Sequence, residues 1–235
     1  MAHKHDLRRL RAGTVINVTS KRQESDVIQA LRSVEQSLQK EYGASLTWQP
    51  TWLLAQIVQE LVYTYPDIDF HHHFHTSSIR PDGGILCIQA ANPSSVVYPI
   101  LISEAKNQGT NDLRLREGLK KQAKGNAIER LGKNVIGLRT AMMRESIFPF
   151  VCFGYGCDFT PDSSIRDRVT TIAMFGHINK TYLFNQGDGR FNRGSFYFRE
   201  KKWTVDEMAE IMEDIAKRSV LYYFAKYGKE IFMGK

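Results

Sequence analysis

Cysteine is scarce in this chain, and long apolar runs are missing from it. The 235 residues contain three cysteines, Cys87, Cys152 and Cys157. An odd number of cysteines without an apolar signal segment predicts a reduced, intracellular protein with no disulfide framework. No stretch approaches the roughly 18 apolar residues that a membrane-spanning helix needs. We therefore expect a soluble, cytoplasmic protein that has no membrane partner.

Two common kinds of site are incomplete as well. Cys152 and Cys157 flank a glycine-rich turn, but no second cysteine pair or nearby histidine completes a zinc site, so we expect buried or half-buried thiols. The Gly-x-Gly stretches at residues 154–156 and 187–189 lack the full spacing of a phosphate-binding loop. These absences argue against a zinc protein and against a nucleotide-binding enzyme.

Positive charge, in contrast, is plentiful. The formal net charge of +7 suits a polyanionic partner such as nucleic acid, because Lys and Arg displace counterions from phosphates, although many basic proteins bind no nucleic acid. A chain of 235 residues with 42% hydrophobic content can bury one sizeable core, and we expect a single domain over residues 1–235. Residues 1–12 are rich in His, Lys and Arg, which predicts a mobile basic arm, with an ordinary disordered terminus as an equal alternative.

Helical and strand-like patterns alternate along the chain. Apolar residues at three- and four-residue spacing predict helices over residues 25–42, 52–64 and 126–143 and from about residue 204 onward. Alternating or continuously apolar runs predict strands over residues 68–75, 84–89, 96–106 and 148–153, with a turn at residues 91–95 and a polar loop after Lys106. Strands bracketed by helices indicate an α/β fold with a mixed central sheet flanked by helices.

Residues 71–75 contain four histidines. Histidines at alternate positions of a strand can share a metal ion, but we find no Asp or Cys partner for them nearby. A partly exposed polar strand face is the preferred interpretation, and we assign no metal to this cluster.

The centre of the chain carries two carboxylates and a lysine. Side chains alternate along the strand at residues 96–106, so Glu104 and Lys106 project to one face. Taken alone, this Glu-x-Lys pattern is typical of a structural ion pair. However, a hairpin-like return would bring Asp82, at the start of the adjoining strand, beside Glu104. Phosphodiester hydrolysis needs such a set, because Mg²⁺ prefers hard oxygen ligands and a nearby cation favours hydroxide and stabilises the transition state. Gly83 and Gly84 lack side chains, which would let the backbone approach a phosphate closely.

Several ordered motifs around these residues carry a resemblance to a known family. They are residues 77–85 (SSIRPDGGI), 104–109 (EAKNQG), 125–130 (GNAIER), 145–150 (ESIFPF) and 186–190 (QGDGR). In these motifs the chain resembles the PD-(D/E)XK nucleases and, within them, the EcoRI/MunI branch of type II restriction endonucleases. The resemblance covers roughly residues 76–235, and the amino-terminal third shows little that matches. It implies a restriction endonuclease-like fold, Mg²⁺ as the cofactor, double-stranded DNA as the substrate and a homodimer as the active form.

The resemblance also implies roles for particular residues. The catalytic residues it implies are Asp82, Glu104 and Lys106, of which Asp82 and Glu104 bind the metal together with the backbone carbonyl of Ala105. The DNA-binding residues it implies are Lys124, Gly125, Asn126, Ala127, Glu129, Arg130, Arg166 and Arg168. Residues 125–127 are expected to enter the major groove as extended backbone and to lead into a helix that begins with Glu129 and Arg130. Asn can pair with adenine N6 and N7, which agrees with this role, while a solvated helix face is the alternative for Glu129 and Arg130.

The same motifs imply a palindromic target that contains AATT and is cut to leave 5′ overhangs. The residue before Gly125 is Lys124, which departs from the family pattern and leaves GAATTC, CAATTG and AATT alone open. Lys124 could contact either guanine or a phosphate. The segment at residues 158–176, which includes Arg166 and Arg168, is shorter than in the family. A cognate DNA methyltransferase is implied as a functional companion but not as a stable partner.

Two other functions fit the same residues. One is a structure-specific repair nuclease with the PD-(D/E)XK fold, which would show no preferred site on plain duplex DNA. The other is a DNA-binding protein that has kept the scaffold without catalysis, which the presence of all three catalytic residues disfavours.

Overall fold

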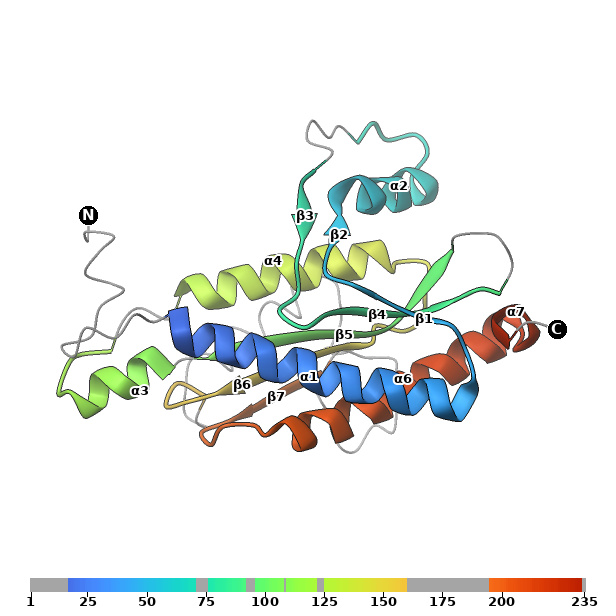
Figure 1. Cartoon of the computed structure of the whole chain (residues 1–235). Coiled ribbons are helices and arrows are strands. Elements are labelled where there is room, and N and C mark those ends of the chain that lie inside the picture. The colour runs from blue at the N-terminus through green and yellow to red at the C-terminus, as the bar shows by residue number, and fades with distance from the viewer. Residues whose placement is uncertain are drawn as a thin grey trace.

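The computed structural model describes residues 17–70, 76–91, 96–107, 109–121, 125–159 and 195–233. Within these residues the chain forms a central sheet with helices on both faces (Figure 1). The expected arm at residues 1–12, the histidine cluster at residues 71–75 and most of the expected turn at residues 91–95 lie outside the described part. No helix in the described residues is both long enough and apolar enough to cross a bilayer.

The central sheet has five strands in the order β1-β4-β5-β6-β7. Its antiparallel half and its parallel half meet at β5, which pairs antiparallel with β4 and parallel with β6. The sheet is therefore mixed, as the sequence predicts. Its strands are β1 (Leu46–Gln49), β4 (Gly84–Gln89), β5 (Val97–Asn107), β6 (Phe150–Tyr155) and β7 (Ser195–Arg199).

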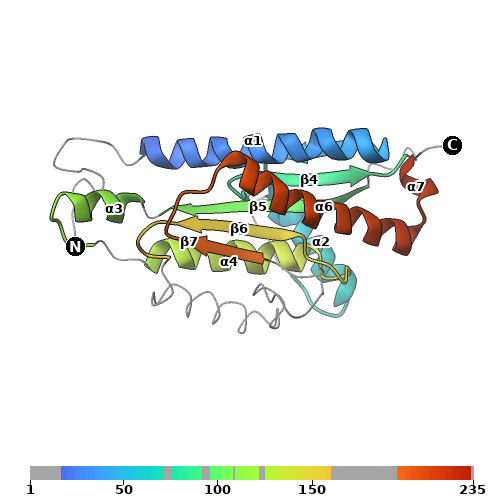
Figure 2. The same ribbon diagram turned by 90° about the horizontal axis from the view of Figure 1, so that it is seen from below.

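The two longest helices lie together on one side of this sheet, and a third helix lies on the other side (Figures 1 and 2). The first pair is α1 (Asn17–Tyr42) and α6 (Val205–Tyr227), and the third helix is α4 (Gly125–Ala141). Ser37 of α1 donates a hydrogen bond to Glu213 of α6 over 2.7 Å, and Lys217 pairs with Glu41 at 2.7 Å. Helices α1 and α6, which are far apart in the sequence, are thus packed against each other.

The helix predicted over residues 25–42 is confirmed, although α1 begins earlier, at Asn17. Its predicted apolar face is buried, with Val27, Leu31, Val34 and Leu38 at most 1% exposed. The helix ends at Gly43, whose φ of 63° is a left-handed conformation that glycine adopts without strain. The Gly43 N–H donates to the Gln39 carbonyl over 2.9 Å and closes the last turn.

The carboxy-terminal helix also begins where the sequence predicts. Thr204 is the N-cap of α6, and its hydroxyl accepts a hydrogen bond from the backbone N–H of Glu207 at 3.2 Å. The Glu207 carboxylate in turn accepts from the Thr204 backbone N–H at 2.9 Å. This reciprocal capping box satisfies two donors that the first turn of a helix leaves open.

Four sequence-based expectations need correction. Residues 52 and 53 form β2 (Trp52–Leu53), which pairs with β3 (Ser78–Ile79), so the helix α2 (Leu54–Thr64) begins two residues later than predicted. Residues 68–70 are not a strand, since they pair with no described strand. The polar segment after β5 contains the helix α3 (Gly109–Arg116), because Thr, Asn and Asp are as typical of helix starts as of loops. The sequence patterns also missed β1 and β7, while a short last helix, α7 (Glu230–Met233), follows α6.

Candidate active site

Two carboxylates and a lysine meet at one end of β5. Gly84, the first residue of β4, pairs with Ser103 of β5, and this antiparallel register places the preceding turn beside the last residues of β5. Asp82 lies in that turn, and Glu104 and Lys106 lie on β5. The hairpin-like return expected from the sequence therefore exists, and it brings together all three residues predicted to be catalytic.

Hydrogen bonds connect these residues to one another. The backbone N–H of Asp82 donates to Glu104 Oε2 over 3.0 Å. Asp82 Oδ2 accepts from the Ala105 backbone N–H at 3.2 Å and from Lys106 Nζ at 3.1 Å. Lys106 Nζ also donates to Glu104 Oε1. The ammonium thus bridges one oxygen of each carboxylate.

The three side chains differ in their access to solvent. The side chain of Glu104 is 1% exposed, that of Lys106 15% and that of Asp82 26%. Burial raises the pKa of the Glu104 carboxyl, although the ammonium of Lys106 opposes this effect. Burial alone would lower the pKa of Lys106, but the Glu104 and Asp82 carboxylates outweigh it and hold that pKa above its usual value. Lys106 is therefore a protonated cation at neutral pH.

The donor set at this position fits a hard divalent cation. In a strand, the N–H and C=O of one residue point to the same side, so the Ala105 carbonyl faces the side from which its N–H reaches Asp82. Asp82 Oδ1 accepts no hydrogen bond from any described residue, which leaves it available to a cation. Two carboxylates and a carbonyl are oxygen ligands of the kind Mg²⁺ takes while it keeps several waters. The described residues contain no group of three or more His, Cys, Asp or Glu that could hold a metal, so this cluster is not a closed cage.

Packing explains the two glycines after Asp82. A Cβ on Gly83 would lie 2.0 Å from Ser103 Oγ and 2.5 Å from a methyl carbon of Val27. Gly84 has a φ of 82°, and a Cβ there would lie 2.5 Å from the indole nitrogen of Trp48. Glycine is therefore required at these positions because the turn packs closely against other residues of the same chain. The close approach to a phosphate, which the sequence suggests, is not needed to explain the two glycines.

The predicted DNA-reading residues are only partly described. Residues 125–127 form the first turn of α4, so the extended backbone expected there is wrong for this structure. Asn and Gly are favoured at helix starts, which allows the helix to begin before Ile128, a buried residue of its apolar stripe. Glu129 and Arg130 are exposed.

The remaining predicted DNA-binding residues cannot be placed. Lys124, Arg166 and Arg168 lie outside the described residues. The structure therefore brings the three residues predicted to be catalytic together. It also exposes Glu129 and Arg130, two of the residues predicted to bind DNA.

A polar residue of α4 that the sequence patterns missed contacts the active site. Asn134 Nδ2 donates to Glu104 Oε1 over 3.4 Å, from the helix face that covers the sheet. The sequence pattern could have indicated this residue, because Asn134 lies next to Val135, within the apolar stripe that Leu131 and Leu138 form. A polar side chain beside an apolar stripe must find a partner, and here the partner is the Glu104 carboxylate, which the sequence predicts to be catalytic.

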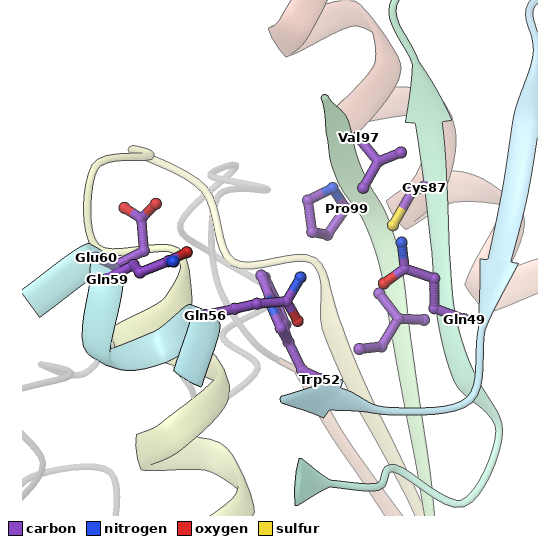
Figure 3. Close-up of a pocket in the computed structure, with 9 residues that line it drawn as sticks. Gln49, Trp52, Gln56, Gln59, Glu60, Cys87, Val97 and Pro99 are labelled. Atoms are coloured by element: carbon purple, nitrogen blue, oxygen red, sulfur yellow. The ribbon is translucent and has the colours of Figure 1, made fainter. Parts of the chain in front are cut away.

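A separate pocket lies between α2 and the sheet (Figure 3). Its residues come from α2, from β1, β2 and β4, and from the start of β5. The list is Gln49, Trp52, Gln56, Gln59, Glu60, Ile85, Cys87, Val97 and Pro99. None of the predicted catalytic residues lines this pocket.

The cysteines behave as predicted. Cys87 and Cys152 are buried and Cys157 is partly buried, and none forms a disulfide. Burial raises the pKa of the Cys87 thiol to about 12.

Comparison with known proteins places this geometry in a family. Residues 11–166 and 162–232 match the family model described as restriction endonuclease EcoRI. The type II restriction enzyme RsrI of Cereibacter sphaeroides is 34% identical over an alignment of 179 positions, which covers 62% of this chain and 64% of that relative. The type II restriction enzyme EcoRI of Escherichia coli is 30% identical over an alignment of 235 positions, which covers 80% of each chain.

The family match begins well before the motifs that carry the resemblance. It includes α1 and β1, where the sequence shows few recognisable motifs. Much of what α1 contributes is a buried apolar face, which leaves no short motif. Together with the mixed sheet and the helices on both of its faces, the match shows that this chain belongs to the EcoRI family of type II restriction endonucleases.

Proposed function

We propose that this type II restriction endonuclease is a Mg²⁺-dependent homodimer that cuts both strands of DNA at a palindromic site containing AATT and leaves 5′ overhangs. The observation that carries the proposal is the convergence of Asp82, Glu104 and Lys106 at the end of β5. A buried and a partly exposed carboxylate, bridged by a lysine through hydrogen bonds, form the arrangement that phosphodiester hydrolysis needs.

Each residue of the site has a distinct task in this proposal. Asp82, Glu104 and the carbonyl of Ala105 hold the metal. A Mg²⁺ ion bound there supplies polarisation of the scissile phosphate and lowers the pKa of a bound water. Lys106 orients the attacking water and stabilises the negative charge that develops on the phosphate. Asn134 restrains the Glu104 carboxylate through its 3.4 Å hydrogen bond.

Sequence reading is proposed for the amino-terminal end of α4. Asn126 would pair with adenine, and Gly125 and Ala127 would let the backbone approach the base edges. Support comes from the exposure of Glu129 and Arg130, which leaves both side chains accessible to a ligand.

Other cations of the chain would complete the DNA contact. Lys124 would read an outer base pair or bind a phosphate, and Arg166 and Arg168 would contact bases or phosphates from their segment.

Two copies are required because identical elements read a palindrome. A two-fold dimer would supply one active site for each strand. Such an enzyme would work in the cytoplasm beside a methyltransferase that protects the host sites. Sedimentation with and without DNA tests the dimer, and a monomer under both conditions contradicts it.

The decisive experiment is cleavage of duplexes that carry AATT with every combination of flanking pairs, followed by sequencing of the product ends. Cleavage that requires AATT supports the proposed specificity, whereas cutting at branched or mismatched DNA without AATT supports a structure-specific nuclease. The variant Asn126→Ala should reduce the preference for the cognate site at least about ten-fold, because a bidentate contact contributes roughly 1–3 kcal/mol of discrimination. Its nonspecific, salt-dependent DNA binding should remain.

A further inference from the structure

The turn that carries Asp82 is held by a tryptophan from another strand. The Gly83 peptide lies immediately after Asp82, and its carbonyl accepts a hydrogen bond from the indole Nε1 of Trp48 at 3.0 Å. The Gly83 N–H donates to the Ser103 carbonyl at 2.9 Å. The residue after Asp82 is therefore bonded on one side to β1 and on the other side to β5.

Both bonds matter because glycine has the most conformational freedom of all residues. Without them, rotation about the Gly83 backbone would move the point from which the Asp82 side chain emerges. Among the described residues, the backbone of Asp82 makes one hydrogen bond to the site, from its N–H to Glu104 Oε2 at 3.0 Å. The turn itself is closed by the Gly84 N–H, which donates to the Pro81 carbonyl at 3.1 Å. The indole is thus one of the few contacts that fix the orientation of this turn.

The position of Trp48 is itself well determined. Trp48 lies on β1, opposite Leu86 of β4 in the antiparallel register. The guanidinium of Arg32, from α1, lies over its ring at 4.9 Å from the centroid. Gly84 has no side chain, and the indole occupies the space that a Cβ there would need. An indole N–H that is withdrawn from water needs an acceptor, and the only acceptor it has among the described residues is Gly83 O.

The geometry points to Trp48 as a positioning residue that orients the metal-binding carboxylate of Asp82 through the Gly83 carbonyl. This inference rests on the proposed function, in which Asp82 binds the metal. It gives the amino-terminal part of the chain a role in the active site, since β1 supplies the indole and α1 supplies the guanidinium that covers it.

The test is the variant Trp48→Phe, which keeps an aromatic ring at this position and removes the N–H donor. The fold offers a matched control in Trp203, whose Nε1 donates to the Gly154 carbonyl at 3.1 Å and whose ring lies under the Arg199 guanidinium at 3.6 Å. Trp203→Phe removes the same kind of bond, from a tryptophan that has no contact with the Asp82 turn among the described residues. Asp82→Ala defines the signal of a protein that lacks the proposed metal ligand.

Metal binding is measured without turnover, by following the electron paramagnetic resonance signal of free Mn²⁺ during titration of each full-length protein. We expect Trp48→Phe to bind Mn²⁺ roughly three- to ten-fold more weakly than the wild-type protein, which is the effect of one neutral hydrogen bond. The Mg²⁺ concentration for half-maximal cleavage should rise by a similar factor, while nonspecific DNA affinity without metal stays the same. Thermal unfolding of the two tryptophan variants shows whether their losses of stability are alike.

Three results are informative. If Trp48→Phe binds Mn²⁺ like the wild-type protein while Asp82→Ala does not, Trp48 has no positioning role and the inference is overturned. The same conclusion follows if Trp203→Phe weakens metal binding as much as Trp48→Phe, because the effect would then not be specific to the indole that contacts the Asp82 turn. If Asp82→Ala binds Mn²⁺ as tightly as the wild-type protein, it is the proposed metal site that fails.

Discussion

Replacing Lys106 should separate metal binding from catalysis. The variant Lys106→Ala removes the ammonium that bridges Asp82 Oδ2 and Glu104 Oε1. A metal ion that uses the same carboxylate oxygens is repelled by this ammonium in the wild-type protein. Without it, we expect the metal to bind more tightly and DNA cleavage to be lost, because nothing then orients the attacking water or stabilises the negative charge that develops on the phosphate.

The size of the gain follows from the geometry. Two unit charges about 4 Å apart interact by about 1 kcal/mol in bulk water and by about 4 kcal/mol at an effective dielectric constant of 20. The Lys106 and Asp82 side chains are 15% and 26% exposed, so the site lies between these limits. Even the lower limit corresponds to about five-fold tighter binding. We therefore expect Mn²⁺ affinity to rise at least about five-fold.

The same variant should be less stable when no metal is present. Removing one partner of a fully buried ion pair costs about 3–5 kcal/mol, and the partial exposure of Asp82 reduces this to about 1–3 kcal/mol. Urea unfolding in a chelator and in Mg²⁺ measures both quantities, and the added metal should stabilise Lys106→Ala more than the wild-type protein. Lys106→Met is the matched variant, since it keeps an apolar stem and removes only the charge. Near-normal cleavage by either variant, or unchanged metal affinity, would refute this reasoning.

Three further predictions concern single groups. Ser103→Ala should stabilise the fold by about 1 kcal/mol in urea unfolding, because the buried Ser103 hydroxyl has no hydrogen-bond partner among the described residues; a loss of stability would contradict this. Burial raises the pKa of the Cys157 thiol to about 11, so its reaction with a disulfide reagent should be slow at pH 8 and accelerate steeply toward pH 10. The buried Cys87 should react only after unfolding, and rapid labelling of both thiols at pH 8 would be inconsistent with the structure. The hydrogen bond from Arg199 lowers the pKa of the Glu207 carboxyl to about 2, so the stability that this carboxylate contributes is present above its ordinary pKa of 4.5 and is lost as the pH falls toward 2. The urea midpoint of Glu207→Gln should therefore change less with pH across that window than the midpoint of the wild-type protein, and an equal change in both would contradict this prediction.

The convergence of the three proposed catalytic residues could be predicted from the sequence because it depends on one strand and one short turn. Alternation along one strand places Glu104 and Lys106 on one face, and a short return brings Asp82 to them. The long helices α1 and α6 could also be predicted, since their buried residues recur at helical spacing and a capping box marks the start of α6.

The contacts that support the site could not be predicted in this way. Trp48 reaches Gly83 across 35 residues, and Asn134 reaches Glu104 across 30 residues. The residues next to Trp48 and Asn134 in the sequence do not indicate which distant residue each one contacts. The short strands β2 and β3 could not be predicted from the sequence for a similar reason, because each is defined only by its pairing with the other.

The packing of α1 against α6 has a consequence for how the protein is made. Ser37 and Glu213 are joined although they lie 176 residues apart in the chain. At a synthesis rate of about 5–20 residues per second, roughly 9–35 seconds pass between the two positions. During that time the apolar face of α1 cannot be covered by α6, and long-range pairing of this kind also slows folding. The contact between α1 and α6 can therefore form only late, after the chain has been synthesised beyond Glu213.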